Sequence, residues 1–160
     1  MTDGADKVRA LLDVVRILEA VGAPYALIGG VAVGIHAGVP RATVDTDFAV
    51  HTSHRTGKLA DSLVAAGFER RGEHLHSINF RHASGEPVQL AFDAAFDAMI
   101  GRAEAFDFEG VSIRIVSRDD LIAMKRRAAG DPSRRRSKAL RDRADVELLS
   151  GDVPEPDEGW

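Results

Sequence analysis

The chain has 160 residues, of which 44% are hydrophobic and 29% charged, and its formal net charge is −4. This length and composition fit one globular domain with a buried core, and no apolar stretch approaches the ~20 residues of a membrane span. The chain has no cysteine, which excludes disulfides, thiolate zinc sites and cysteine nucleophiles.

The two ends of the chain carry their own signals. The first twenty residues contain four acidic side chains, so they lack the basic and then apolar pattern of a secretory signal. We therefore expect a cytoplasmic protein that makes no membrane contact. We also expect one domain at residues 1–150 and a disordered tail at 151–160, because prolines, glycines and acidic residues in that tail disfavour packing.

Hydrophobic periodicity predicts helices and strands that alternate along the chain. In chain order, the expected elements are a helix at 7–21, a strand at 25–28, a helix at 31–36, a strand at 43–50, a helix at 56–66, an extended piece at 68–71, strands at 74–80 and 87–92, a helix at 96–105, a hairpin across 106–115, and helices at 121–128 and 137–149. Ser117 and Asp120 form a Ser-x-x-Asp cap before the helix at 121–128.

Two aspartates, Asp45 and Asp47, fall in the strand predicted at 43–50. Side chains alternate faces along a strand, so both carboxylates point the same way and share a small volume. Like charges this close raise one pKa unless a cation neutralises them, and hard oxygen ligands suit Mg²⁺ or Mn²⁺ together with substrate phosphates. The spacing therefore predicts a divalent ion bound by Asp45 and Asp47.

A glycine pair, Gly29-Gly30, follows the strand at 25–28. Glycine lets the backbone approach a ligand closely, and the helix that follows offers unpaired amides to an anion. If the strands at 25–28 and 43–50 are neighbours, this turn lies beside the aspartates and can hold the phosphates of a nucleoside triphosphate. Arg41 and Thr43, on the approach to the second strand, add candidate phosphate contacts.

A family resemblance rests on a longer set of residues. These are Gly29, Gly30, Ala32, His36, Arg41, Thr43, Asp45 and Asp47, followed by Arg102-Ala103, residues 117–125 and Asp142-Arg143-Ala144-Asp145. They resemble the signature of the polymerase-beta-type nucleotidyltransferase superfamily, in the form found in small bacterial proteins related to abortive-infection toxins of toxin–antitoxin systems. The likeness covers residues 25–149.

The resemblance implies an α+β fold, a small mixed β-sheet with helices packed on it and further helices at the C-terminus. It also implies transfer of a nucleoside monophosphate from an NTP, such as ATP, to a hydroxyl group of a protein, an RNA or a small molecule. In this scheme Asp45 and Asp47 are catalytic and hold the metal ion, Gly29 and Gly30 hold the triphosphate, and Lys125 contacts the nucleotide phosphates.

One position departs from the family pattern. Relatives carry a third carboxylate in a strand reading Val-Asp-Leu-Leu, whereas this chain reads Val-Gln-Leu-Ala with Gln89 in the acidic position. An amide cannot act as the general base, a task worth about 10²–10⁴ in rate. Asp93 has the same strand parity as Gln89 but lies about 13 Å further along an extended chain. The alternative function is therefore a nucleotide-binding protein with impaired catalysis.

Charge is uneven along the chain, and the one strongly basic stretch runs from Lys125 to Arg143, with Arg126–Arg143 as the candidate contact for a partner. A solvated helix face explains most of these charges, while a surface that binds RNA or an acidic protein is the second interpretation. A toxin–antitoxin interaction protein is thus a third hypothesis. The remaining histidines, at positions 51, 54, 74, 76 and 82, are interpreted as surface residues, since no third metal ligand at suitable spacing accompanies His74 and His76.

Overall fold

The computed structural model describes residues 4–39 and 41–153. In chain order, the elements are α1 (Gly4–Val21), β1 (Tyr25–Ile28), α2 (Gly29–Ala37), β2 (Thr46–Val50), the 3₁₀ turn η1 (Thr52–His54), α3 (Lys58–Ala65), β3 (Glu69–Glu73), β4 (Ser77–Arg81), β5 (Pro87–Ala91), α4 (Ala94–Gly101), β6 (Glu104–Phe108), β7 (Val111–Ile115), α5 (Arg118–Ala129) and α6 (Arg136–Leu149). Part of the predicted tail, from residue 154 onward, lies outside the described residues.

The strands form one sheet in the order β3-β4-β5-β2-β1-β7-β6. β2 lies at its centre, antiparallel to β1 and parallel to β5. β1 in turn runs parallel to β7 near the other edge. The sheet is therefore mixed, and the α+β fold class implied by the sequence is confirmed.

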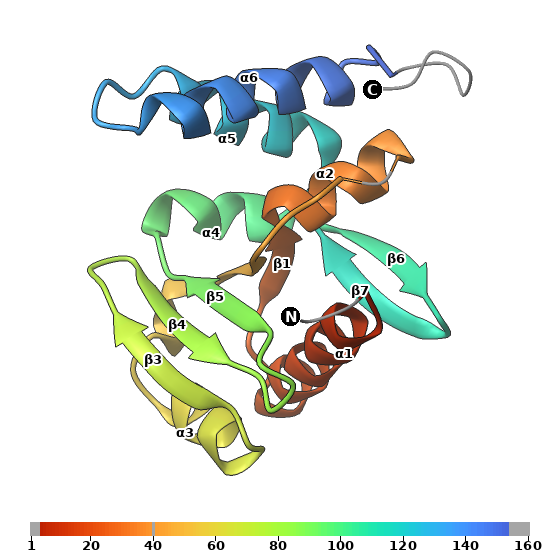
Figure 1. Ribbon diagram of the computed structural model, residues 1–160. Coiled ribbons are helices and arrows are strands. Elements are labelled where there is room, and N and C mark those ends of the chain that lie inside the picture. The colour runs from red at the N-terminus through yellow and green to blue at the C-terminus, as the bar shows by residue number, and fades with distance from the viewer. Residues whose placement is uncertain (1–3, 40, 154–160) are drawn as a thin grey trace.

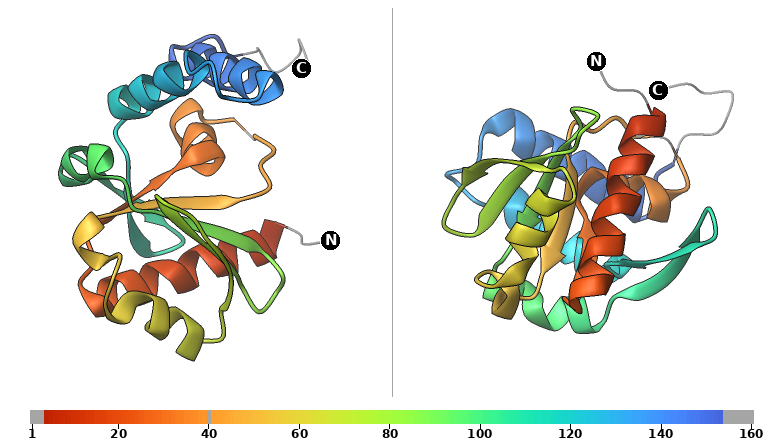
Figure 2. Two further views of the ribbon diagram at one scale, coloured as in Figure 1. Left: turned by 90° about the vertical axis from the view of Figure 1, so that its left-hand side faces the viewer. Right: turned by 90° about the horizontal axis from the view of Figure 1, so that it is seen from below.

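Helices form layers on both faces of this sheet (Figure 1). α1 and α3 lie together on one face, and α2 and α4 cover β1 and β2 on the other. α5 and α6 form an antiparallel hairpin that packs on α2, so it lies one layer further from the sheet (left view in Figure 2). α2 therefore lies between the sheet and the helical hairpin.

The core lies mainly between the sheet and α1. The apolar stripe of α1 is buried, and Val14 and Leu18 are fully inaccessible, as the three-and-four spacing of the sequence predicts. Phe48 of β2 meets it from the centre of the sheet and contacts the ring of Tyr25 edge-on, with ring centroids 5.9 Å apart. This packing fixes β1 and β2, the two strands that carry the candidate site.

Several predicted boundaries are wrong. The strand expected from Thr43 begins only at Thr46, where pairing with β5 begins. The helix expected at 96–105 spans Ala94–Gly101, because Asp93 caps it earlier and β6 pairs with β7 from Glu104 onward. Helix-forming residues at 102–105 thus yield to tertiary strand pairing. Among the described residues, no helix is long and apolar enough to cross a lipid bilayer.

Candidate functional site

Asp47 lies in the central strand, in a row that crosses the sheet. Ile28 of β1 pairs with Asp47, which pairs with Gln89 of β5, which pairs with Asn79 of β4. Directly opposed residues of neighbouring strands point to the same face. The carboxylate of Asp47 therefore shares one face of the sheet with two neutral amide side chains.

Asp45 precedes the strand, so its position does not follow from strand parity. Its side chain is exposed, and its carbonyl accepts a hydrogen bond from Thr43 Oγ1 at 3.2 Å. The charge of Asp45 raises the pKa of Asp47, which shows that the two carboxylates lie within electrostatic reach of each other. The shared strand face predicted for the two carboxylates is wrong, because Asp45 lies in the loop before β2 and not in the strand.

The electrostatics of Asp47 depart from those of an ordinary surface carboxylate. Burial and then the neighbouring Asp45 raise its pKa from 3.8 to about 6, against the opposing charges of Lys125, Lys7 and Lys138. Its Oδ1 is inaccessible to solvent and has no hydrogen-bond partner within the described residues. A buried carboxylate oxygen without a partner is costly, and a bound cation removes that cost.

The glycine turn meets Asp47 directly. Gly29 has φ of 72°, and a Cβ placed on it would lie 2.4 Å from Asp47 Oδ2. A Cβ on Gly30 would lie 2.6 Å from Arg41 Nη1 and 2.8 Å from the Thr43 side chain. Both glycines open the helix α2, two residues earlier than predicted, so the first free amides of that helix lie beside Asp47.

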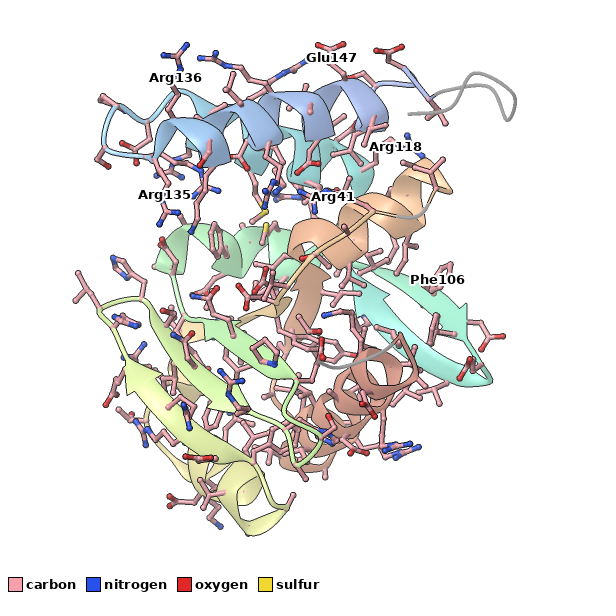
Figure 3. The ribbon with its side chains drawn as sticks, in the orientation of Figure 1. Arg41, Phe106, Arg118, Arg135, Arg136 and Glu147 are labelled. Atoms are coloured by element: carbon pink, nitrogen blue, oxygen red, sulfur yellow. The ribbon has the colours of Figure 1, made fainter. Side chains whose placement is uncertain are left out.

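Arg41, a predicted phosphate contact, is bound to protein in this structure. It pairs with Asp145 of α6 through two hydrogen bonds, 2.6 Å from Nε to Oδ1 and 2.8 Å from Nη2 to Oδ2. Figure 3 shows Arg41 between α2 and the helical hairpin. Bidentate pairs of this kind fix orientation, so Arg41 ties the loop before β2 to α6.

Lys125, another predicted phosphate contact, joins the same network. Its ammonium lies 3.3 Å from Asp142 and 3.1 Å from Asp145, and both carboxylates are 2% exposed. Arg134 also pairs with Asp142. Three cations thus surround two anions, and one of the cations, Lys125, lies within electrostatic reach of Asp47 and lowers its pKa.

The structure distinguishes the two candidates for the third position. Gln89 pairs directly with Asp47, and its side chain makes no hydrogen bond within the described part of the chain. Asp93 follows the end of β5 and accepts the amide of Ala95 at 2.9 Å as the N-cap of α4. Gln89 therefore occupies the position beside the acidic pair. Asp93 has a local structural contact instead.

Sequence reasoning missed residues that approach the site from distant elements. Lys7 of α1 donates to the Val44 carbonyl at 2.9 Å and pairs with Glu86, which is 1% exposed. No local pattern marks Lys7, which reads as an ordinary helix charge. Asn79 lies between buried Ile78 and Phe80, so the sequence alternation predicts which face of the sheet it is on. The sequence does not predict that it pairs with Gln89 of β5.

The histidines behave mostly as packing or loop residues. His36 lies 2.6 Å from the Val116 carbonyl. The surface interpretation of His82 is wrong, because it is 8% exposed and lies 2.7 Å from Asp13 and 2.8 Å from Ser84 Oγ. Within the described ranges, no group of three or more His, Cys, Asp or Glu residues is placed to hold a metal ion. Two carboxylates suffice for Mg²⁺ when substrate phosphates supply further ligands, so the donor set fits that ion.

The basic stretch divides into two parts. Lys125 and Arg134 are paired with buried carboxylates, whereas the other seven cations are exposed and make no ion pair within the described residues: Arg126, Arg127, Arg135, Arg136, Lys138, Arg141 and Arg143. Consecutive Arg135 and Arg136 point to opposite sides of the hairpin, toward α4 and away from it (Figure 3). Part of this charge thus lies on the side of the hairpin that faces α4 (Figure 3).

A cavity of about 670 Å³ lies between α4 and α5. Phe96, Met99 and Met124 give it an apolar lining, and Asp93 and Arg127 contribute charge. Neither Asp45 nor Asp47 lines it, so it is separate from the acidic pair. Met124 nevertheless precedes Lys125 on α5, which places the cavity next to the charged network.

Comparison with known families agrees with this geometry. The model of the nucleotidyl transferase AbiEii toxin family, from type IV toxin–antitoxin systems, matches residues 9–158. The chain belongs to this family. The resemblance inferred from the motif is therefore confirmed. No curated protein sequence matches the chain significantly.

Solved structures support the fold of this AbiEii family member. The chain is similar to the lincosamide antibiotic adenylyltransferase LnuA bound to lincomycin, with a TM-score of 0.64, 13% identity and coverage of 91% of this chain and 97% of that one. The antibiotic-resistance factor ANT(2'')-Ia has a TM-score of 0.67 and 16% identity, with coverage of 94% of this chain and 87% of that one. JHP933 from Helicobacter pylori has a TM-score of 0.57 and 19% identity, with coverage of 94% of this chain and 67% of that one. Identities this low show a shared fold alone.

Proposed function

We propose that this protein transfers a nucleoside monophosphate from an NTP to an acceptor hydroxyl, with a divalent ion, Mg²⁺ or Mn²⁺, held by Asp45 and Asp47. The observation that carries the proposal is Asp47, whose buried Oδ1 has no hydrogen-bond partner among the described residues and whose Oδ2 lies directly beside the Gly29 turn. When bound, the ion neutralises charge on the phosphates and orients them. Family membership supports the same chemistry.

The residues of the chain then have separate tasks. Gly29 and Gly30 let the side chains of the site approach the turn closely, and the first amides of α2 donate to the phosphates. Lys125 and Arg41 hold positive charge above the turn, paired with Asp145 until phosphate oxygens compete for them. Because Asp145 pairs with both cations, neither Arg41 nor Lys125 is unpaired before the triphosphate binds.

The order of the strands supports a direction for the proposed reaction. β1, which leads into the glycine turn, lies on one side of β2, and β5 and β4 lie on the other. In-line displacement needs the attacking and leaving oxygens on opposite sides of the phosphorus. Pyrophosphate therefore leaves on the α2 side. The acceptor oxygen attacks the α-phosphorus from the side of Gln89 and Asn79, while its proton passes to solvent.

The test is transfer of label from each of four [α-³²P]NTPs, with Mg²⁺ or Mn²⁺, to total RNA, to protein and to small hydroxyl compounds. We expect transfer by the native chain and loss of at least 100-fold in Asp45→Asn and Asp47→Asn. Asp61→Asn, on the exposed surface of α3, is the matched control and should retain full activity. Transfer by Asp45→Asn and Asp47→Asn at the rate of the native chain would refute the proposal.

A second candidate function is nucleotide binding without turnover. It is favoured by Gln89, whose amide lies beside Asp47 where a carboxylate would activate the acceptor. It predicts Mg²⁺-dependent NTP binding by calorimetry, no transfer in the native chain, and transfer in Gln89→Asp. Turnover by the native chain would exclude this alternative.

The exposed cations of the α5–α6 hairpin suit a polyanionic partner, and we propose that they contact RNA in the cytoplasm. Arg135→Gln should weaken RNA binding more than Arg136→Gln, because only Arg135 points toward α4 (Figure 3). Binding should also weaken steeply with salt.

If the protein acts as a toxin, its expression alone arrests growth, and a small partner protein relieves the arrest. Capture of an acidic protein with no RNA binding would favour a protein partner.

A further inference from the structure

Asp45 lies outside the sheet, so hydrogen bonds between strands do not hold it in place. Pairing of β2 with β5 begins at Thr46, and the side chain of Asp45 is exposed. A metal site needs its ligands fixed within fractions of an ångström by surrounding contacts. Something other than strand pairing must therefore keep the Asp45 carboxylate next to that of Asp47.

Lys7 supplies such a contact from the start of the chain. Its ammonium donates a hydrogen bond of 2.9 Å to the carbonyl of Val44, the residue before Asp45. The same ammonium pairs with Glu86 in the turn between β4 and β5. On the other side of Asp45, its own carbonyl accepts from Thr43 Oγ1. The backbone around Asp45 is thus held on both sides.

The Lys7–Glu86 pair is not an ordinary surface ion pair. Glu86 is 1% exposed and Lys7 is 24% exposed, and the second oxygen of Glu86 has no hydrogen-bond partner within the described residues. Burying a carboxylate is costly unless it is paired. Glu86 therefore keeps the ammonium of Lys7 in one place, and the ammonium keeps the Val44 carbonyl in place. Lys7 also lies within electrostatic reach of Asp47, whose pKa it lowers.

We propose that Lys7 is a positioning residue of the candidate metal site, holding Asp45 beside Asp47 through the Val44 carbonyl, with Glu86 as its buried anchor. The proposal rests on the proposed function, since it assigns Asp45 to the metal ion. It makes α1, which carries no part of the nucleotidyltransferase motif, a component of the active centre.

Whether Mn²⁺ binds more tightly or more weakly after Lys7 is removed separates a positioning role of Lys7 from a purely electrostatic one. A nearby ammonium repels a divalent cation, so a purely electrostatic Lys7 predicts tighter Mn²⁺ binding in Lys7→Met. Positioning predicts weaker binding. The double variant Lys7→Met/Glu86→Gln removes one positive and one negative charge, which keeps the local net charge and avoids an unpaired buried carboxylate. Lys7→Arg retains both contacts, and Arg9→Met, on the exposed surface of the same helix, is the matched control.

Mn²⁺ affinity is measured by electron paramagnetic resonance at pH 7.5, and hydrogen exchange is measured for residues 42–46 without metal. We expect Lys7→Met/Glu86→Gln to bind Mn²⁺ at least tenfold more weakly and to exchange at least tenfold faster in that segment. Lys7→Arg should recover most of both properties, and Arg9→Met should match the native chain.

Failure of the two proposals is distinguishable. Equal or tighter Mn²⁺ binding by the double variant, or unchanged exchange at residues 42–46, would overturn the positioning role while leaving the metal site intact. Absence of Mn²⁺ binding in the native chain would overturn the proposed function. In that case faster exchange in the double variant would still show that Lys7 fixes the loop, but as a structural contact alone.

Discussion

Replacing Asp47 with asparagine should stabilise the metal-free protein at neutral pH. Burial, reinforced by Asp45, raises the pKa of Asp47 from 3.8 to about 6 in the folded state. The folded chain therefore holds this proton more tightly than the unfolded chain does, so the native protein loses stability as pH rises from about 4 to about 6. A shift of about 2 pKa units corresponds to about 3 kcal/mol, an upper value for the gain in Asp47→Asn.

The assay is urea unfolding of both proteins in chelator between pH 4 and pH 8, with Asp61→Asn as a surface control. The difference in free energy of unfolding between Asp47→Asn and the native chain should be near zero at pH 4 and approach its maximum above pH 6. Added Mn²⁺ should then stabilise the native chain and leave Asp47→Asn unchanged. A difference that does not vary with pH would refute the reasoning that Asp47 is ionised at a net cost.

Three further changes test the fold around the site. Gly29→Ala should lower the free energy of unfolding by about 1–3 kcal/mol in denaturant titrations and abolish Mn²⁺ binding, because φ is 72° and the new Cβ would meet Asp47; unchanged stability would contradict this. Asp145→Ala should cost about 3–5 kcal/mol by the same measurement, since Arg41 loses its bidentate partner. Leu18→Ala should lower stability by about 2–5 kcal/mol, and a loss below 1 kcal/mol would show that its neighbours close the cavity.

Local signals in the sequence predicted the elements that lie near one another in the chain. The apolar stripe of α1, the Ser117 cap and the alternation of the β6–β7 hairpin all appear in the structure, because each depends on contacts within a few residues. The adjacency of the glycine turn and Asp47 was also predictable once two consecutive strands were assumed to pair. The family motif added the mixed sheet, which no local pattern specifies.

Contacts across long sequence separations were not predictable. Glu86 appears in the sequence as an ordinary turn residue, yet it is buried by Lys7, 79 positions away. His82 is buried because it contacts Asp13 on α1, 69 positions away. Both residues lie at the β4–β5 turn, where charged and polar side chains are normally solvated. The packing of α1 against that turn, with Phe68 edge-on against His82, makes them internal.

The loop between α2 and β2 shows how the site depends on both ends of the chain. Arg41, at its beginning, is bound to Asp145 of α6, and Val44, near its end, is bound to Lys7 of α1. The residues between Arg41 and β2 have no strand partner, so these two contacts, together with the hydrogen bond from Thr43 Oγ1 to the Asp45 carbonyl, hold Asp45 in place. Under the proposed function, the two aspartates can thus hold a metal ion together only when the first and last helices are packed. Loss of either contact should therefore weaken metal binding before it unfolds the sheet, since Asp47 itself is held by β1 and β5.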